Sequence, residues 1–377
     1  MEVEVRVLIA PDSFTGTLTS SQAAETIAQG WAQAAPWDEL DIAAISDGGP
    51  GFLDAIAMDA GIELLPIFVK SLTQQLIPTA IGLTKVDQRT AYIESATIIG
   101  SALVAIFPKT PEKYSSFGIG EAILAAKEQG AKKVIVGLGG TGLVDGGAGM
   151  LAALGARPAE LLTQGGLALS DLTFVDLEPV ISAVAGMEFQ IATDVLVPLL
   201  GERGAAMGFG AQKGADRETQ IQLEKSLQHF SFVLGKRSDG KDPALILGAG
   251  AAGGLGFGLL HLNAKVQSGF SFVDAALGLT DRIAQADLVI TGEGAFDWQS
   301  MHGKAIAQVA KTALQLGKPV VVLAGRVEVG RREWSAQGIV GAYAAAHDGE
   351  IPEDPQMSLS SLATRVARTY SPNPWQT

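Results

Sequence analysis

The sequence predicts an α/β protein with two domains, and three observations support this fold class. The chain has 377 residues, which is longer than a typical domain built around a single hydrophobic core. Short apolar strands alternate with amphipathic helices at both ends of the chain, as in parallel βαβ units. The middle of the chain is less regular. We therefore expect a doubly wound parallel sheet built from both chain ends, with a second α/β domain inserted.

The N-terminal segment is predicted to fold as a βαβ unit. Val5–Ala10 reads VRVLIA, a short apolar run typical of a buried strand. Thr19-Ser20 offers an N-cap, and the apolar spacing predicts a helix over Ala23–Ala34. Leu40–Ile45 predicts the second strand of this unit.

The pattern then changes, because three strand-like segments follow one another without a helix. They are Leu64–Lys70, Ile77–Leu83 and Thr90–Glu94, and they predict an antiparallel element at the entrance to the inserted domain. Farther along, the pattern predicts helices over Gly118–Gln129, Ala148–Leu154 and Arg217–Phe232, and strands over Lys133–Leu138 and Phe189–Thr193.

The C-terminal region returns to alternating strands and helices. The expected elements are strands at Asp287–Ile290, Val320–Ala324 and Ile339–Tyr343 and a helix over Lys304–Leu316. A proline-rich tail after Gly349 is expected to be loose up to a helix at Leu359–Tyr370. We therefore predict a Rossmann-like or flavodoxin-like domain from residues 1–64 and 286–377, and an inserted α/β domain from residues 65–285.

Composition excludes several classes of function. Hydrophobic residues make up 47% of the chain and charged residues 18%, so a large core can form. The net charge of −13 and the lack of a basic stripe predict no nucleic-acid partner. No charge-free apolar run reaches about 18 residues, which predicts no membrane span. The absence of cysteine removes thiolate chemistry, and an N-terminus without an apolar signal segment favours a cytoplasmic location.

Polar groups follow the first two predicted strands. Asp12 and Ser13 lie directly after the first strand, and Asp47 lies after the second. The first segment offers a carboxylate, a hydroxyl group and a helix N-terminus that can receive an anion. The alternative is that these residues only cap the helix that follows and bind no ligand.

A glycine-rich loop follows the strand predicted at Lys133–Leu138. Six of the eleven residues of Gly139–Gly149 are glycine. Glycine lets backbone N–H groups approach phosphate oxygens, and successive amides can form an anion-binding nest. The alternative is close packing of a helix on a strand, and we favour phosphate binding over it.

A third polar group follows the strand at Phe189–Thr193. Asp194 is the best candidate for a general base, because burial at a strand end can raise the pKa of a carboxylate. Arg203 and Lys213 could hold phosphate or carboxylate groups. A set of surface salt bridges is the alternative.

The segment Ala286–Ala305 begins as a buried strand and ends in a glycine turn with charged residues. In open α/β sheets, ligands bind at the carboxyl ends of strands. Glu293 or Asp297 could hold Mg²⁺, which prefers one or two carboxylates together with substrate phosphates. Lys304 could reach a phosphate, or it could be an ordinary solvated helix residue.

One glycine motif is interpreted as packing. Gly248–Gly253 matches G-x-G-x-x-G after a strand-like Leu245–Leu247, with Asp274 farther on. A lone match of this kind is weak, although it keeps a nucleotide-dependent dehydrogenase as a competing hypothesis. The chain contains no P-loop sequence and no histidine spacing that suits a metal.

Six longer motifs carry a resemblance over nearly the whole chain. They are APDSFTGTL, SDGGPG, SFGIGEAI, VGLGGTGLVDGGAGMLAALGA, ATDVLVPLLGERGAAMGFGAQKGA and ADLVITGEGAFDWQSMHGKA. In this order they resemble the bacterial glycerate kinase family, of the glycerate 2-kinase type. The resemblance implies a two-domain enzyme that uses ATP and Mg²⁺ to phosphorylate D-glycerate in the cleft between its domains. It favours 2-phosphoglycerate as product and is compatible with a homodimer.

The resemblance also carries site residues onto this chain. It implies phosphate binding by Gly139, Gly140, Gly146 and Gly147. It implies active-site positions at Asp12, Ser13, Asp47, Asp194, Lys213, Glu293, Asp297 and Lys304. Within this set we assign Asp194 as the base, Lys213 or Lys304 to phosphates, and Asp297, Glu293 or Asp47 to Mg²⁺. Arg203 is our candidate for the cation that the glycerate carboxylate needs.

The chain departs from the family's usual pattern inside these motifs. The family usually has Lys at Thr15, Glu-Gly-Thr at Pro50–Phe52, Asn at Val144, Asx-Asn at Leu196-Val197 and Arg at Ala295. Phosphoryl transfer depends on positioning and on charge stabilisation, so these losses bear on activity. A diverged homologue that binds a nucleotide or a hydroxy acid, without catalysis or with another substrate, is therefore the second hypothesis.

Overall fold

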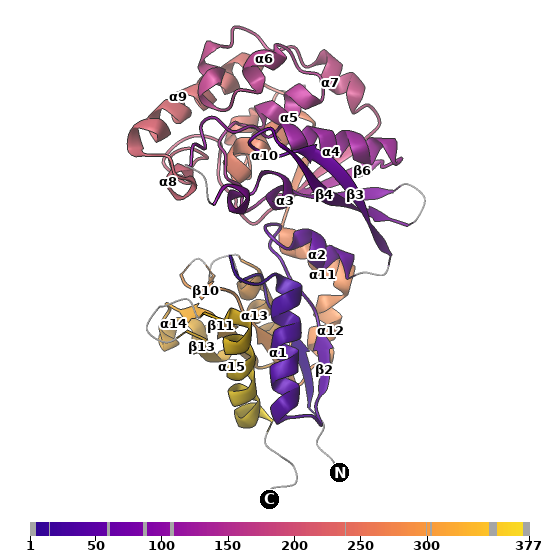
Figure 1. Ribbon diagram of the computed structural model, residues 1–377, viewed down its shortest axis with the longest axis vertical. Helices are drawn as coiled ribbons and strands as arrows, with labels where there is room; N and C mark the ends of the chain where they lie inside the picture. The colour runs from indigo at the N-terminus through magenta and orange to yellow at the C-terminus, as the bar shows by residue number, and fades with distance from the viewer. Residues whose placement is uncertain are drawn as a thin grey trace, which may run out of the picture. The chain divides into compact units, whose positions relative to one another are not determined.

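The chain divides into two compact units, drawn in the computed structural model of Figure 1. The structure describes residues 5–14, 16–58, 61–85, 89–105, 109–237, 239–298, 300–301, 304–346 and 353–371. Unit 1 comprises Met1–Asp47, Asp54–Asp59 and Phe270–Thr377, and unit 2 comprises Gly48–Leu53 and Ala60–Gly269. The chain thus enters the long part of unit 2 at residue 60 and leaves it after residue 269. The sequence pattern predicts an inserted domain that begins at residue 65 and ends at residue 285.

Unit 1 is built on a five-stranded parallel sheet with the order β13-β11-β9-β1-β2. Its strands are β1 (Arg6–Ile9), β2 (Glu39–Ile42), β9 (Leu288–Thr291), β11 (Val320–Ala324) and β13 (Ile339–Ala344), and a two-stranded ribbon joins β10 (Ala295–Phe296) to β12 (Arg326–Val327). Its helices are α1 (Ser20–Ala34), α11 (Gly269–Leu277), α12 (Leu279–Gln285), α13 (Ala305–Gln315), α14 (Arg331–Ser335) and α15 (Pro355–Tyr370), while α2 (Phe52–Ala57) spans the division between the units.

Helices cover both faces of this sheet, which confirms the doubly wound class. Side chains that alternate along β1, β9 and β11 pack in one core cluster with α1 and α15. Helices α12 and α13 contact β1 and β9 on the other side (Figure 1). The pairing of α1 with α15 is close, because a Cβ on Gly30 would lie 2.2 Å from the carbonyl oxygen of Ser360. Only glycine permits this approach.

Unit 2 contains a six-stranded sheet with the order β3-β4-β5-β6-β7-β8. Its strands are β3 (Ile62–Lys70), β4 (Leu76–Thr84), β5 (Thr90–Glu94), β6 (Lys133–Gly137), β7 (Glu188–Ala192) and β8 (Lys265–Gln267). Its helices are α3 (Ser95–Ile99), α4 (Phe117–Glu128), α5 (Ala148–Ala153), α6 (Ala159–Leu162), α7 (Glu178–Ala183), α8 (Gly210–Lys213), α9 (Arg217–Leu234) and α10 (Ala251–His261). The first three strands pair antiparallel, as expected, and the others pair parallel.

Two local expectations were wrong, and each has a physical reason. Leu245–Leu247 is not a strand, because Pro243–Leu245 forms a 3₁₀ turn capped by the side chain of Asp242. The last helix begins at Pro355 rather than at Leu359, because Asp354 caps it by accepting from the N–H of Met357. The N-cap expected at Thr19-Ser20 is confirmed: Thr19 and Gln22 form a capping box, so that α1 begins at Ser20, three residues before the expected Ala23.

No helix within the described ranges combines the length and the apolar character needed to cross a membrane.

Candidate active site

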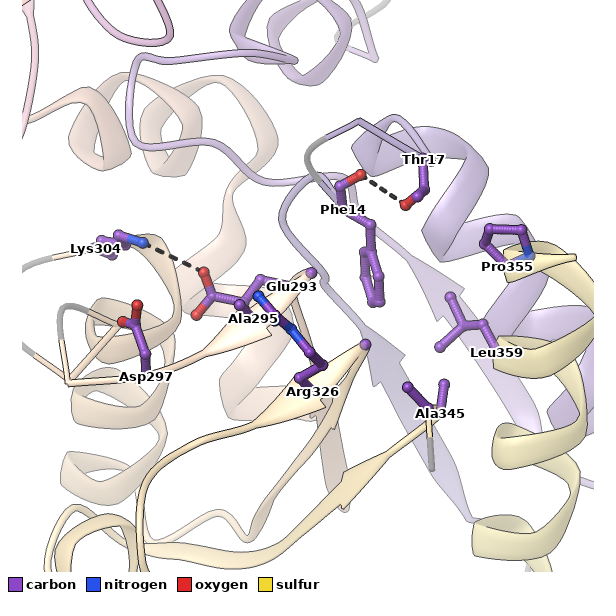
Figure 2. A pocket seen from close by; sticks show the side chains of 13 residues that line it. Phe14, Thr17, Glu293, Ala295, Asp297, Lys304, Arg326, Ala345, Pro355 and Leu359 are labelled. Carbon is purple, nitrogen blue, oxygen red and sulfur yellow. Dashed lines mark hydrogen bonds and ion pairs between the residues drawn. The ribbon is translucent and has the colours of Figure 1, made fainter. Parts of the chain in front are cut away.

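The carboxyl ends of four parallel strands meet at one edge of the unit 1 sheet and form a cavity of about 290 Å³, which we call cavity 1 (Figure 2). Its lining comprises Phe14, Thr17, Glu293, Gly294, Ala295, Asp297, Lys304, Gly325, Arg326, Ala345, Ala346, Pro355 and Leu359. Backbone hydrogen bonds hold the strand ends together: the Asp12 N–H donates to Gly292 at 2.8 Å, and the Gly325 N–H donates to Glu293 at 3.0 Å. This edge is where open α/β sheets bind ligands.

Glu293 has one paired and one unpaired oxygen in cavity 1. Its side chain is almost fully buried, and Oε2 lies 3.6 Å from Nζ of Lys304. Oε1 is also buried and accepts no hydrogen bond from the part of the chain that the structure describes. Burial raises the pKa of Glu293, and the Lys304 ammonium opposes this shift. An unsatisfied buried oxygen of this kind is suited to a proton donor or a cation.

The neighbouring carboxyl groups interact with one another. Burial raises the pKa of Asp12 well above its usual range, and the charges of Asp47 and Glu293 raise it further. The Ser13 N–H donates to Oδ1 of Asp12 at 2.6 Å, which partly offsets the shift. The structure therefore brings four predicted residues, Asp12, Ser13, Asp47 and Glu293, into one electrostatic group in unit 1.

Asp297 lies on the same cavity and is held by Ser300. The N–H and the hydroxyl of Ser300 are 3.0 and 3.1 Å from Oδ1 of Asp297. Within the described ranges, no cluster of three or more acidic or histidine side chains could by itself hold a metal. The donor types nevertheless suit Mg²⁺, which takes one or two carboxylates and completes its shell with water and phosphate oxygens.

Unit 2 has its own cavity of about 280 Å³, which we call cavity 2. It is lined by Ser101, Leu138, Gly139, Gly140, Thr141, Val195, Phe209, Gln212, Lys213, Gly250, Ala252 and Gly253. The Lys213 side chain is buried, and its ammonium group donates to Oγ1 of Thr141 at 2.8 Å and to the Thr141 carbonyl. Burial lowers the pKa of Lys213 to about 7. None of these lining residues is acidic, so cavity 2 presents a cation without a counter-charge of its own.

The second half of the glycine-rich loop is used for packing. The Gly146 N–H donates to Gly253 at 3.1 Å, and the Gly147 N–H donates to Oδ1 of Asp145 at 2.9 Å. A Cβ on Gly147 would lie 3.0 Å from Gly258 in helix α10. Gly146 and Gly147 thus lie apart from the lining of cavity 2, whereas Gly139 and Gly140 belong to it.

Five further predicted residues lie outside both linings: Asp12, Ser13, Asp47, Asp194 and Arg203. Asp194 is half-buried two residues after the end of β7, beside Val195, which lines cavity 2. Arg203 is exposed. The structure therefore groups Lys213 with Gly139 and Gly140 in unit 2, and it groups the acids with Lys304 in unit 1.

Sequence reasoning missed several lining residues. Thr141 and Gln212 belong to cavity 2, and the Gly250 and Gly253 backbone forms part of its wall although that motif was interpreted as packing alone. Arg326 lines cavity 1 and follows the end of β11. The strand-end rule that identified Glu293 applies equally to Arg326 and could have found it.

The residues that depart from the family pattern lie partly in the packed interior and partly in a cavity wall. Val144 is fully buried in the core of unit 2, and Pro50 packs against Gly140. Ala295 lines cavity 1, and Thr15 lies outside the described residues. The polar-to-apolar changes at Val144 and Pro50 are thus matched to packing, whereas the change at Ala295 alters a cavity wall.

Comparisons with known proteins give one consistent result. Residues 7–371 match the sequence profile of the Glycerate kinase family. The chain is 36% identical over 370 residues to a glycerate kinase of Halalkalibacterium halodurans, covering 97% of each chain. It is 37% identical over 329 residues to the glycerate 2-kinase of Escherichia coli, covering 85% of each. The crystal structure of a protein assigned as glycerate kinase 2 from Salmonella typhimurium LT2 matches with a TM-score of 0.78 and 32% identity, covering 97% of each chain.

Proposed function

The chain belongs to the glycerate kinase family, and from that premise we propose that it transfers the γ-phosphoryl group of ATP to D-glycerate. The name of the Escherichia coli relative favours the 2-hydroxyl as acceptor, with 2-phosphoglycerate and ADP as products. The observation that carries the proposal is the buried ammonium group of Lys213, whose described hydrogen bonds go to Thr141 alone. A buried cation without an acid partner is stabilised by a bound anion.

Cavity 2 suits phosphate oxygens in two respects. Gly139 and Gly140 leave its wall without side chains, so that a phosphate can approach the backbone closely. The Lys213 ammonium supplies the charge, and the Thr141 hydroxyl holds that ammonium in place. We propose that these residues bind phosphate groups of the nucleotide.

Cavity 1 suits a phosphate-bound magnesium ion. Asp297, Glu293 or Asp47 would supply carboxylate ligands, and the unsatisfied Oε1 of Glu293 is the observation that supports this. When bound, Mg²⁺ would neutralise charge on the transferring phosphoryl group. Lys304 balances the charge of Glu293, and Asp12, with its raised pKa, can hold a proton near these groups.

The acceptor hydroxyl needs a base, and we propose Asp194 for this role. Its position after β7 supports the assignment, because the carboxyl ends of parallel strands carry the reacting groups in α/β enzymes. Its carboxylate would accept the proton of the glycerate hydroxyl while the hydroxyl oxygen attacks the γ-phosphorus.

A substrate-shifted or non-catalytic homologue is the second candidate. Ala295 favours it, because a small apolar side chain stands in the wall of cavity 1 where the family pattern leads one to expect a guanidinium group. In that case ATP or a hydroxy acid would bind without formation of phosphoglycerate.

Release of ADP by the purified protein with ATP, Mg²⁺ and D-glycerate, against a control without glycerate, tests the proposal. Glycerate-dependent ADP with 2-phosphoglycerate identified by NMR is the expected result. ATP binding without phosphorylated product, across a panel of hydroxy acids, would favour the second candidate.

A further inference from the structure

We propose that Arg326 binds an acid group of a substrate in cavity 1, and that Ala295 leaves the space for its side chain. The chemical class of the ligand is an oxyanion. It is either the carboxylate of the hydroxy acid or a phosphate of the nucleotide, and this choice of sources rests on the proposed function. Arg203, the candidate assigned above to the glycerate carboxylate, lies outside cavity 1, and the Lys304 ammonium in that cavity is paired with Glu293.

Strand pairing brings Arg326 and Ala295 together. In the two-stranded ribbon of β10 and β12, Ala295 is the direct partner of Arg326, and the Arg326 N–H donates to Gly294 at 3.0 Å. Directly paired residues of neighbouring strands point to the same side of the ribbon. Both line cavity 1, and Figure 2 shows the Arg326 side chain beside Ala295. Arg326 is thus directed into the cavity by backbone geometry.

Lys304, the other cationic side chain in the described lining of cavity 1, already has a partner. Lys304 forms an ion pair with Glu293, and Asp297 accepts hydrogen bonds from Ser300. Among the described residues, Arg326 forms one ion pair, in which Nη2 lies 3.5 Å from Oε1 of Glu328. Both of these side chains are about half exposed, so their attraction is weak and screened by solvent. A ligand can therefore replace Glu328 as the partner of this guanidinium with little loss of interaction free energy.

The surroundings favour an oxyanion at Arg326. The planar guanidinium can donate two parallel hydrogen bonds to a carboxylate or a phosphate, which a lysine cannot match. Phe14 and Leu359 give the cavity an apolar wall, and a bound ligand would exclude water against it. Exclusion of water strengthens an ionic hydrogen bond. The site therefore has both the donor geometry and the apolar environment that make such a contact strong.

The pairing also gives the departure at Ala295 a structural meaning. A guanidinium at position 295 and one at position 326 would project from paired positions of the same ribbon into the same cavity. We infer that Arg326 supplies, from the neighbouring strand, the cation that position 295 does not supply in this chain.

Calorimetric titration of the full-length protein with D-glycerate, with ATP and with inorganic phosphate tests the inference. Arg326→Ala is expected to raise the Kd of one substrate by about tenfold to hundredfold, as expected for loss of a charged hydrogen-bonded contact. Loss of glycerate binding would identify a carboxylate, and loss of ATP binding a phosphate. Glu328→Gln is the matched control, because it removes the competing ion pair and should leave the Kd unchanged or lower. Equal effects of both substitutions, or a Kd within about twofold of wild type, would overturn the inference.

The double variant Ala295→Arg/Arg326→Ala tests the equivalence of the two positions. Recovery of binding relative to Arg326→Ala is expected, and a double variant no better than Arg326→Ala would refute the equivalence. If the wild-type protein turns over and Arg326→Ala changes no Kd, the proposed kinase function is supported and the role of Arg326 is refuted. If binding depends on Arg326 but no phosphorylated product forms, the role of Arg326 is supported and the kinase function is refuted. A wild-type protein that binds none of the three probes would refute both proposals.

Discussion

The Lys213 ammonium group and the Thr141 hydroxyl form a buried hydrogen bond of 2.8 Å in unit 2. Thr141 follows β6 in the glycine-rich loop, and Lys213 ends helix α8, 72 residues later in the chain. Helix packing has thus brought a cation to a loop whose backbone can approach a phosphate.

The stability of the protein should depend on pH through Lys213. Because its folded pKa is lowered to about 7, the unfolded chain binds a proton that the folded chain releases between about pH 7 and pH 10.5. Stability attributable to this residue therefore rises with pH across that window. Relative to Lys213→Met, the wild-type free energy of unfolding should rise by about 4 kcal/mol from pH 6.5 to pH 10, as measured by urea unfolding. The exposed Lys241→Met is the control, and the same trend there would contradict the assignment.

Asp194→Asn should lower kcat while ATP binding persists. The amide keeps the size of the side chain and cannot accept the hydroxyl proton, so a fall of about 10² to 10⁴ in kcat is expected. ADP release and a parallel ATP titration measure the two effects. Normal turnover by the variant would remove Asp194 from the reaction.

Asp145→Asn should destabilise unit 2. The fully buried Asp145 carboxylate accepts from the N–H and hydroxyl of Ser116 and from the N–H groups of Gly147 and Gly149. An amide nitrogen would face donors, at a cost of about 2–4 kcal/mol. The same change at Asp216, an exposed N-cap of α9, should cost about 0.5 kcal/mol or less. Equal losses in thermal unfolding of the two variants would refute this account.

Alanine substitutions at two glycines with similar backbone angles distinguish the cost of a left-handed backbone from the cost of a steric clash. Gly253 has φ +69° and would place a Cβ 2.0 Å from the Leu143 carbonyl oxygen, whereas Gly278 has φ +59° and open space around it. Gly278→Ala should therefore cost about 1 kcal/mol, the strain of a left-handed residue. Gly253→Ala should cost several times more and disturb cavity 2. Similar melting temperatures for the two variants would show that the clash with the Leu143 carbonyl oxygen adds no destabilisation.

Glu94→Gln should loosen the segment Gly48–Leu53 within unit 2. The buried carboxylate accepts the N–H groups of Gly51 at 3.2 Å and Leu53 at 2.9 Å. Replacing the charged acceptor weakens both bonds, by about 1 kcal/mol or more together. Amide hydrogen exchange of Leu53 should become faster, with the exposed Glu63→Gln as control. Unchanged exchange of Leu53 would show that other contacts hold the segment.

Local rules predicted the elements whose signals are short-range. The capping residues at Thr19 and the apolar strand at Val320–Ala324 act within a few residues, and the structure has both. The helix start at Pro355 escaped prediction although Asp354 is a good N-cap, because the preceding proline-rich stretch suggested a loose tail. Similarly, Leu245–Leu247 resembled a strand in composition, but Pro243 and the Asp242 cap favour a turn.

The candidate site was partly predictable for a related reason. Residues directly after parallel strands share one edge of a sheet, so Asp12, Glu293 and Asp297 could be grouped from sequence. Glycine density identified the loop at Gly139 and Gly140. It did not show that the N–H groups of Gly146 and Gly147 are already bonded within the protein.

By itself, the sequence determined the α/β class, the family and the polar strand ends, because periodicity, capping and motif order are properties of neighbouring residues. Tertiary structure alone decided which charges meet. The ion pair of Lys304 with Glu293, the burial of Lys213 beside Thr141 and the pairing of Arg326 with Ala295 depend on strand order and helix packing. Desolvation and Coulomb energies depend on distance and burial in space, which the order of residues along the chain does not specify.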